Sequence, residues 1–232
     1  QSDHPAEFGW PQWGGDLADL AERVPQCTPD CKGDACGTPR PIGSPLVVDL
    51  DGDGIQIDPH RTLAFDLADT GELVRVGSLK GSDALVVLDR NGNGRIDSGA
   101  ELFGNNSVCG ERRCFDGIEA LAFFDANRDR VLDASDPIFA RLLLWKDANA
   151  DGFSSADELR PLTSASISSI ELTPRHDLAW TDAHGNAAMS ALSFHGPHGR
   201  QGVIHDVWFA LSFNTMPSNP RTTGAISELA LP

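Results

Sequence analysis

Several features that define common protein classes are missing from this sequence. Basic residues are few, because 18 Lys and Arg side chains stand against 34 Asp and Glu, for a net charge of −16 at pH 7. Such a charge repels phosphate backbones and anionic lipid headgroups and attracts cations, so we expect no nucleic-acid partner. No apolar run approaches the roughly 20 residues that a membrane-spanning helix needs, and we expect no transmembrane segment.

The common catalytic motifs are also absent. The chain has no Gly-rich phosphate-binding loop, no G-x-S-x-G motif and no Cys-His combination of the kind that forms a catalytic dyad. The residues by themselves therefore favour a binding function. We expect no catalytic residue and no organic cofactor.

The cysteines indicate export to an oxidising compartment. They fall into two groups with short spacing, namely Cys27, Cys31 and Cys36 in a Pro/Gly-rich segment, and Cys109 with Cys114 in a polar loop. Short spacings of this kind are typical of local disulfides in exported proteins. We predict a disulfide between Cys109 and Cys114 and leave the pairing of the other three open. The predicted location is secreted, extracellular or at the cell surface, with the periplasm as an alternative.

Composition divides the chain into three parts. Residues 1–44 are rich in Pro, Gly and Cys and are expected to form an N-terminal arm, with one short helix from Gly14 to Val24. Residues 45–210 form the main module. Residues 211–232 are expected to be a flexible tail.

Within the main module, short apolar runs end at acidic or Gly-rich turns, which indicates strands or short buried helices. Asp116 is placed to cap a helix through GIEALAFF, from Gly117 to Phe124. Ser135 or Asp136 is placed to cap a second helix that begins at Pro137, where a missing amide donor does no harm. The module therefore mixes strands with short helices.

One acidic pattern recurs four times and suggests a metal-binding function. Asp or Asn occupies alternate positions in DLDGDG from Asp49, DRNGNG from Asp89, DANRDR from Asp125 and DANADG from Asp147. Ca²⁺ takes six to eight oxygen ligands, and alternate side chains of a tightly curled loop converge on one point. We call these stretches, in chain order, loop one, loop two, loop three and loop four.

Loop four matches the complete 12-residue EF-hand pattern. Its predicted ligands are Asp147, Asn149, Asp151, the Phe153 carbonyl and Glu158. An Asx-rich surface turn is the alternative interpretation, but it does not explain Glu158 at the closing position.

Loop three offers a similar ligand set. Its predicted ligands are Asp125, Asn127, Asp129, the Val131 carbonyl and Asp136. Arg130 stands at the position where a positive φ favours Gly, so loop three should bind less tightly and an Arg130→Gly substitution should tighten it.

Loops one and two depart from the pattern at the closing position. In loop two the predicted ligands are Asp89, Asn91, Asn93, the Arg95 carbonyl and, in a loop widened by one residue, Glu101. In loop one they are Asp49, Asp51 and Asp53, with Asp83 suggested as a ligand from outside the loop. A solvated acidic turn is the alternative for loop one, although three carboxylates so close together repel one another without a cation.

Spacing limits the architecture. Loops two and three are spaced like a pair of helix-loop-helix hands, whereas only PIFARLLLWK separates loop three from loop four. We therefore predict an α+β fold, a compact domain that carries several EF-hand-like calcium loops on a small antiparallel sheet with short helices. About four Ca²⁺ ions should bind and reduce the formal charge from −16 to −8.

The order of segments resembles the calcium-binding self-processing module of bacterial RTX proteins and its haemolysin-type relatives. The resemblance is carried by PLVVDLDGDGI, ALVVLDRNGNGRIDSGAELFGN, GIEALAFFDANRDRVLDASDPIF, LLLWKDANADGFSSADEL and the closing DVWFA. It implies a secreted domain that folds with calcium. In active members calcium triggers cleavage of an Asp-Pro bond just before the module, and a lysine amine can capture the resulting anhydride. The matching bond here is Ser44-Pro45, and serine has no carboxylate to form an anhydride.

Three functions follow from these observations. The first is a secreted calcium-binding protein that acts as a binding or scaffolding module, with another protein or a cell-surface component as its partner. The second is a calcium-triggered Asp-Pro self-cleaving and cross-linking module. The third is a calcium-dependent cell-surface adhesin.

Overall fold

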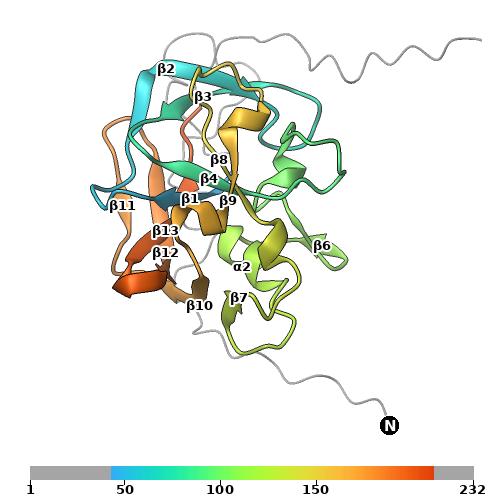
Figure 1. Cartoon of the computed structure of the whole chain (residues 1–232). Coiled ribbons are helices and arrows are strands. Elements are labelled where there is room, and N and C mark those ends of the chain that lie inside the picture. The colour runs from blue at the N-terminus through green and yellow to red at the C-terminus, as the bar shows by residue number, and fades with distance from the viewer. Residues whose placement is uncertain (1–42, 212–232) are drawn as a thin grey trace, which may run out of the picture. The chain divides into compact units, whose positions relative to one another are not determined.

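The described part of the chain is built around one curled antiparallel sheet (Figure 1). In the computed structural model, residues 43–211 of the 232-residue chain are described. In pairing order the strands are β7 (Val131–Asp133), β10 (Ser169–Arg175), β12 (Ala187–His195), β13 (Gln201–Trp208), β1 (Leu46–Asp49), β4 (Ala84–Val87), β8 (Leu143–Trp145) and β9 (Leu159–Pro161). The ninth strand, β11 (Trp180–Thr181), pairs with β12.

Two small antiparallel ribbons accompany the sheet. One pairs β2 (Ile57–Phe65) with β3 (Val74–Leu79), and the other pairs β5 (Val108–Cys109) with β6 (Arg112–Arg113). Short 3-10 turns connect the strands at Gly99–Glu101, Phe139–Arg141, Ala156–Glu158, Leu162–Ala165 and Pro197–Gly199. Among residues 43–211, no helix is long and apolar enough to cross a membrane.

The central strands of the sheet are buried on both faces. Along β1, Leu46 and Val48 belong to one hydrophobic cluster, whereas Val47 belongs to a second cluster that also contains Phe65 and Val76 of the β2–β3 ribbon. Because side chains alternate between the faces of a strand, apolar residues are needed at every position of a strand that is covered on both sides. This explains why the runs LVVD, ALVV and LLW show no polar alternation.

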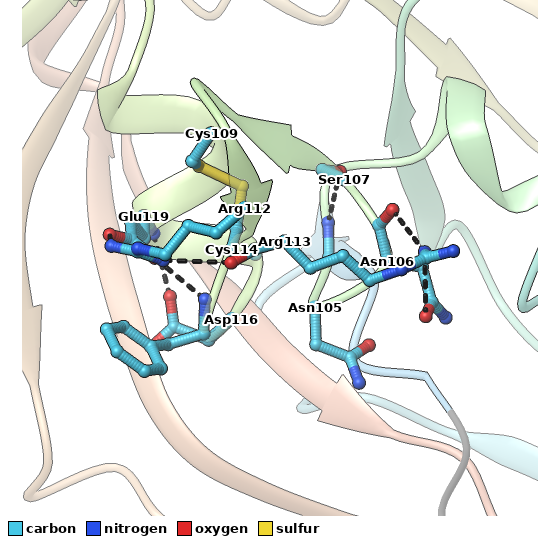
Figure 2. Close-up of a disulfide and its surroundings, with 12 residues drawn as sticks. Asn105, Asn106, Ser107, Cys109, Arg112, Arg113, Cys114, Asp116 and Glu119 are labelled. Atoms are coloured by element: carbon cyan, nitrogen blue, oxygen red, sulfur yellow. Dashed lines mark hydrogen bonds and ion pairs between the residues drawn. A yellow bond between two sulfur atoms is a disulfide. The ribbon is translucent and has the colours of Figure 1, made fainter.

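The expected cap and the expected disulfide are both present. Asp116 accepts a hydrogen bond of 2.7 Å from the Glu119 N–H at the start of α2 (Gly117–Ala122). The Cys109–Cys114 disulfide closes the β5–β6 ribbon, which confirms that prediction. Figure 2 shows Arg112 of this ribbon reaching toward Glu119, with which it forms an ion pair, so the ribbon is held against α2.

The expected α+β class with a small sheet is wrong. The described residues are mostly β, with a nine-stranded sheet and α2 as their one α-helix. The helix expected from Pro137 is reduced to the 3-10 turn Phe139–Arg141. The physical reason is that the Asp136 carboxylate is drawn into loop three, where it accepts backbone N–H groups from Ala126 and Asp133 in place of capping a helix.

Some expectations fall on residues that are not described. These are the helix from Gly14 to Val24, the pairing of Cys27, Cys31 and Cys36, and the nature of the tail beyond residue 211. They stay predictions.

A buried carboxyl group on β13 predicts a pH dependence of stability. Asp206 is 1% exposed, and its Oδ1 accepts a hydrogen bond of 2.9 Å from the Gly117 N–H. Burial raises the pKa of Asp206 well above its ordinary value, and the nearby charge of Asp116 raises it further, while hydrogen bonds from the Ser44 and Trp208 side chains oppose the shift. Between the ordinary Asp pKa of about 4 and the raised pKa of the folded state, Asp206 is therefore protonated in the folded protein and ionised in the unfolded chain.

With the folded pKa raised, the free energy of unfolding falls as pH rises from about 4, the ordinary Asp value, up to the raised pKa of Asp206. An Asp206→Asn variant stays neutral and should lose less stability over that interval. Urea denaturation in EDTA at a series of pH values measures this. Equal pH dependence in the wild type and the variant would contradict the assignment.

Candidate metal centre

Loops one, two and four each follow a strand of the sheet, and they leave the sheet at two opposite ends. Loop one follows β1, loop two follows β4, loop four follows β8, and loop three follows α2. Since β1 and β8 both run antiparallel to β4, loops one and four leave the sheet at one end of these strands and loop two leaves it at the other.

The first aspartate of each loop stabilises the curled backbone of that loop through hydrogen bonds. Its two carboxylate oxygens accept backbone N–H groups from later positions of the same loop. The donors and distances are Gly52 (2.7 Å) and Gly54 (3.0 Å) for Asp49, Gly92 (2.7 Å) and Gly94 (2.9 Å) for Asp89, Arg128 (2.7 Å) and Arg130 (2.9 Å) for Asp125, and Asp151 (3.2 Å) and Gly152 (2.8 Å) for Asp147.

A fifth stretch curls in the same way without a comparable donor set. Asp66 accepts N–H groups from Thr70 at 2.9 Å and Gly71 at 2.8 Å, yet Ala68 and Thr70 stand where the other loops carry Asp or Asn. The curl alone is therefore no evidence of metal binding. What separates loops one to four from this stretch is their set of oxygen donors.

The backbone adopts a positive φ at the fourth and sixth positions of every loop. The angles are 83° and 89° at Gly52 and Gly54, 72° and 76° at Gly92 and Gly94, 61° and 67° at Arg128 and Arg130, and 60° and 78° at Ala150 and Gly152. In loop three both positions carry a side chain, which costs about 1–2 kcal/mol per residue in this region.

We expect Arg130→Gly to relieve this strain and to tighten the cation site of loop three several-fold. Its φ of 67° is suited to Gly, although Gly also loses more backbone entropy on folding, which offsets part of the gain. A calcium titration of the wild type and the variant, followed at the backbone amide of residue 130, measures the change. Arg160→Gly, at an exposed position of β9, is the control for loss of an arginine charge, and equal effects of the two changes would contradict the prediction.

The three aspartates of loop one come together with a fourth carboxylate from outside the loop. One oxygen from each of Asp49, Asp51 and Asp53 lies within 4.8 Å of the others. Asp83, just before β4, is 1% exposed and accepts a 2.8 Å hydrogen bond from the Gln56 N–H through Oδ2. Burial raises the pKa of Asp83 to about 7, and the charges of the three loop aspartates add to the shift. The sequence suggests Asp83 only because loop one lacks a closing carboxylate, since Asp83 lies outside any ligand motif.

The closing carboxylates of the other loops lie beside the loops they were assigned to. Glu101 Oε2 accepts a 2.8 Å hydrogen bond from the Asp97 N–H of loop two, and burial raises the pKa of Glu101 to about 6. Asp136 accepts from the Ala126 N–H at 2.8 Å and the Asp133 N–H at 3.1 Å.

Glu158 makes the same type of contact in loop four. It accepts from the Ala148 N–H at 2.9 Å and the Ser155 N–H at 3.0 Å. In loops three and four the closing group therefore joins the second position to the ninth.

The side chains of the middle positions also converge. In loop three the Asn127 amide lies 2.8 Å from Asp129 Oδ2, and in loop four the Asn149 amide lies 2.8 Å from Asp151 Oδ2. In loop two the amide of Asn93 instead contacts Asp97. The remaining predicted donors are the Asn91 side chain and the carbonyls of Arg95, Val131 and Phe153, which occupy their expected positions in the chain but stay predictions as ligands.

The donor set fits a hard divalent cation. Among the residues that the structure describes, Asp83 Oδ1 and Glu101 Oε1 are buried and accept no hydrogen bond. A buried carboxylate oxygen without a partner is costly unless the group is protonated or a cation lies beside it. Carboxylates, amide oxygens and carbonyls are the ligands that Ca²⁺ takes, and loops one and two therefore fit such an ion on structural grounds.

The chain matches known proteins over the region that carries these loops. A family model described as the SPM domain matches residues 46–210, from the start of β1 to just past β13. The chain is also similar to the iron-regulated protein FrpA of Neisseria meningitidis serogroup C, with 41% identity over 149 residues. That similarity covers 62% of this chain but only 13% of FrpA, so the chain spans a small part of that relative's length. The chain therefore belongs to the SPM domain family.

Proposed function

We propose that this chain is an exported calcium-binding module, in which about four Ca²⁺ ions bind to loops one to four and order the fold. It acts by binding or scaffolding, with calcium controlling whether the binding surface is formed. No residue of the chain needs to react in this function.

The observation that carries the proposal is the group of four carboxylates at loop one. Asp49, Asp51, Asp53 and Asp83 come from two segments of the chain, and the Asp83 carboxyl is buried with one oxygen unpartnered among the described residues. Like charges this close oppose folding. A divalent cation converts that repulsion into attraction and joins loop one to the segment before β4.

Charge and cysteine usage support export. The net charge of −16 falls to −8 with four divalent ions bound, so folding is favoured where calcium is plentiful. Extracellular calcium modules bind with dissociation constants of about 10⁻⁴ to 10⁻³ M. The Cys109–Cys114 disulfide is of the kind that persists outside the cytoplasm.

Isothermal titration calorimetry with Ca²⁺, run beside far-UV circular dichroism, tests the proposal. We expect three or four ions per chain and a gain of β-structure as they bind. No bound ion, or binding without any change in the dichroism or in stability, would contradict the proposal.

The Asp83→Asn substitution tests loop one in particular. We expect it to remove one ion per chain at a given free calcium concentration, because the amide brings neither the charge nor both oxygens of the carboxylate. Asp69→Asn is the charge-matched control, since Asp69 is exposed, lies in the fifth stretch, and has a φ of 55° that Asn tolerates. Loss of the same number of ions in both variants would contradict the assignment of Asp83.

A further inference from the structure

Loops two and four are joined by a buried serine. The Ser154 hydroxyl accepts a 2.6 Å hydrogen bond from the Ile96 N–H and lies 3.2 Å from the Ile96 carbonyl oxygen, to which it donates. Ser154 is 5% exposed and Ile96 is fully buried. Both backbone hydrogen-bonding groups of Ile96 are thus satisfied by one side chain from the other loop.

These two residues occupy equivalent places. Ile96 is the eighth residue of loop two and Ser154 is the eighth residue of loop four. In each loop the eighth residue directly follows the carbonyl assigned as a ligand, which belongs to Arg95 in loop two and to Phe153 in loop four. The Ser154–Ile96 contact therefore lies directly beside both of these carbonyls.

Loops one and three have other partners at the eighth position. Leu132 of loop three lies in β7 and pairs with Ile170 of β10. The Gln56 carbonyl of loop one accepts a 2.9 Å hydrogen bond from the Lys80 N–H. Spacing along the chain suggests that loops two and three form a pair, but the contact at the eighth position joins loop two to loop four.

One hydrophobic cluster lies beside both loops. Ile96 belongs to the cluster that contains Trp145, which stands two residues before the first ligand of loop four. The same cluster contains Val47, two residues before loop one, so the pairing of loops two and four rests on the Ser154–Ile96 hydrogen bonds.

We propose that loops two and four bind calcium as a coupled pair, with Ser154 as the residue that transmits the coupling. This inference rests on the proposed function, because it concerns how the calcium sites influence one another. Ser154 is a positioning residue in this account, since its hydroxyl is engaged with Ile96. Filling either loop fixes the shared contact, so the second ion enters a loop that is already ordered.

A calcium titration of the full chain followed by nitrogen-15 NMR tests the coupling. The backbone amides of Gly94, Arg130 and Gly152 each donate to the first aspartate of their own loop, so they report separately on loops two, three and four. Glu158→Gln weakens loop four directly. We expect it also to lower the affinity of loop two by at least about fivefold, within the usual range of coupling between sites, and to leave loop three within about twofold.

The Ser154→Ala variant should remove that dependence. In the Ser154→Ala protein, adding Glu158→Gln should change the calcium affinity of loop two by less than about twofold. Comparing the wild type, both single variants and the double variant forms a double-mutant cycle that isolates the contribution of Ser154 to the coupling. Ser164→Ala is the matched control, because its exposed hydroxyl donates to the nearby Pro161 carbonyl. If coupling persists at full size in Ser154→Ala, the assignment of the link to Ser154 is overturned.

A reciprocal experiment needs no change at Ser154. By linkage, a calcium ion in loop two must raise the affinity of loop four by the same factor by which an ion in loop four raises that of loop two, so Glu101→Gln, which weakens loop two directly, should also lower the affinity of loop four. If the loops bind calcium but neither substitution changes the affinity of the other loop, the coupling is overturned and the proposed function is not. No calcium response at any of the three amides would instead overturn the proposed function.

Discussion

Removal of calcium with EDTA is expected to lower the melting temperature of the protein by about 12–24 °C. At free calcium tenfold above its dissociation constant, each ion adds about 1.4 kcal/mol to the free energy of unfolding, and four ions add about 6 kcal/mol. For a domain of this size, 1 kcal/mol shifts the melting temperature by about 2–4 °C. The physical source is the clustering of carboxylates, which repel one another once the ions are gone.

Thermal melts in millimolar Ca²⁺ and in EDTA measure this difference. A parallel series in NaCl is the control, because general charge screening acts without specific sites. If high salt restores the whole loss, or if EDTA leaves the melting temperature unchanged, the ions do not stabilise the fold through the loops.

Replacing Gly152 with Ala is expected to lower the free energy of unfolding by about 2–5 kcal/mol, even without calcium. Gly152 has a φ of 78°, which costs a side chain about 1–2 kcal/mol. A Cβ at this position would also lie 2.0 Å from the Ala64 carbonyl oxygen of β2, so backbone must move, at a further cost of about 1–3 kcal/mol. The change therefore breaks the contact between loop four and the β2–β3 ribbon.

Gly94→Ala is the matched control. Gly94 occupies the same sixth position in loop two with a φ of 76°, but its Cβ would meet no atom of the described residues within 4 Å. We expect this change to cost only about 1–2 kcal/mol from the backbone angle. Urea denaturation of both variants in EDTA separates the two contributions. Equal losses would show that the approach of loop four to Ala64 does not contribute to stability.

Local features were predictable because short-range physics sets them. Asp116 caps α2 through an oxygen that reaches the Glu119 N–H three residues later, and Cys109 and Cys114 lie close enough to pair within a ribbon. Alternate acidic residues indicated curled loops, and Arg130 indeed has the positive φ that its place in loop three requires.

Long-range features were not predictable from single residues. The β1 strand pairs with β13 from the far end of the module, as in Leu46 with Asp206, and no local pattern encodes that partner. The apolar runs were compatible with strands or with short buried helices, and the pairing into a nine-stranded sheet decides in favour of strands. This is why the fold class was wrong while the positions of the apolar runs were useful.

The candidate site shows the same division. The loop aspartates follow a motif, whereas Asp83 lies outside the motif and Ser154 stands at a position that the motif leaves unspecified. Asp83 could be suggested only because loop one lacks a closing carboxylate. The contact of Ser154 with Ile96 depends on how β4 and β8 pair and on the path of both loops after those strands.

Counting bound ions by native mass spectrometry tests the central claim most directly. The full chain, sprayed from a volatile buffer with excess calcium, should carry three or four Ca²⁺ ions, and variants at Asp83 and Glu158 should each carry one fewer. A chain that carries no calcium under these conditions, or that carries the same number of ions in both variants as in the wild type, would contradict the account.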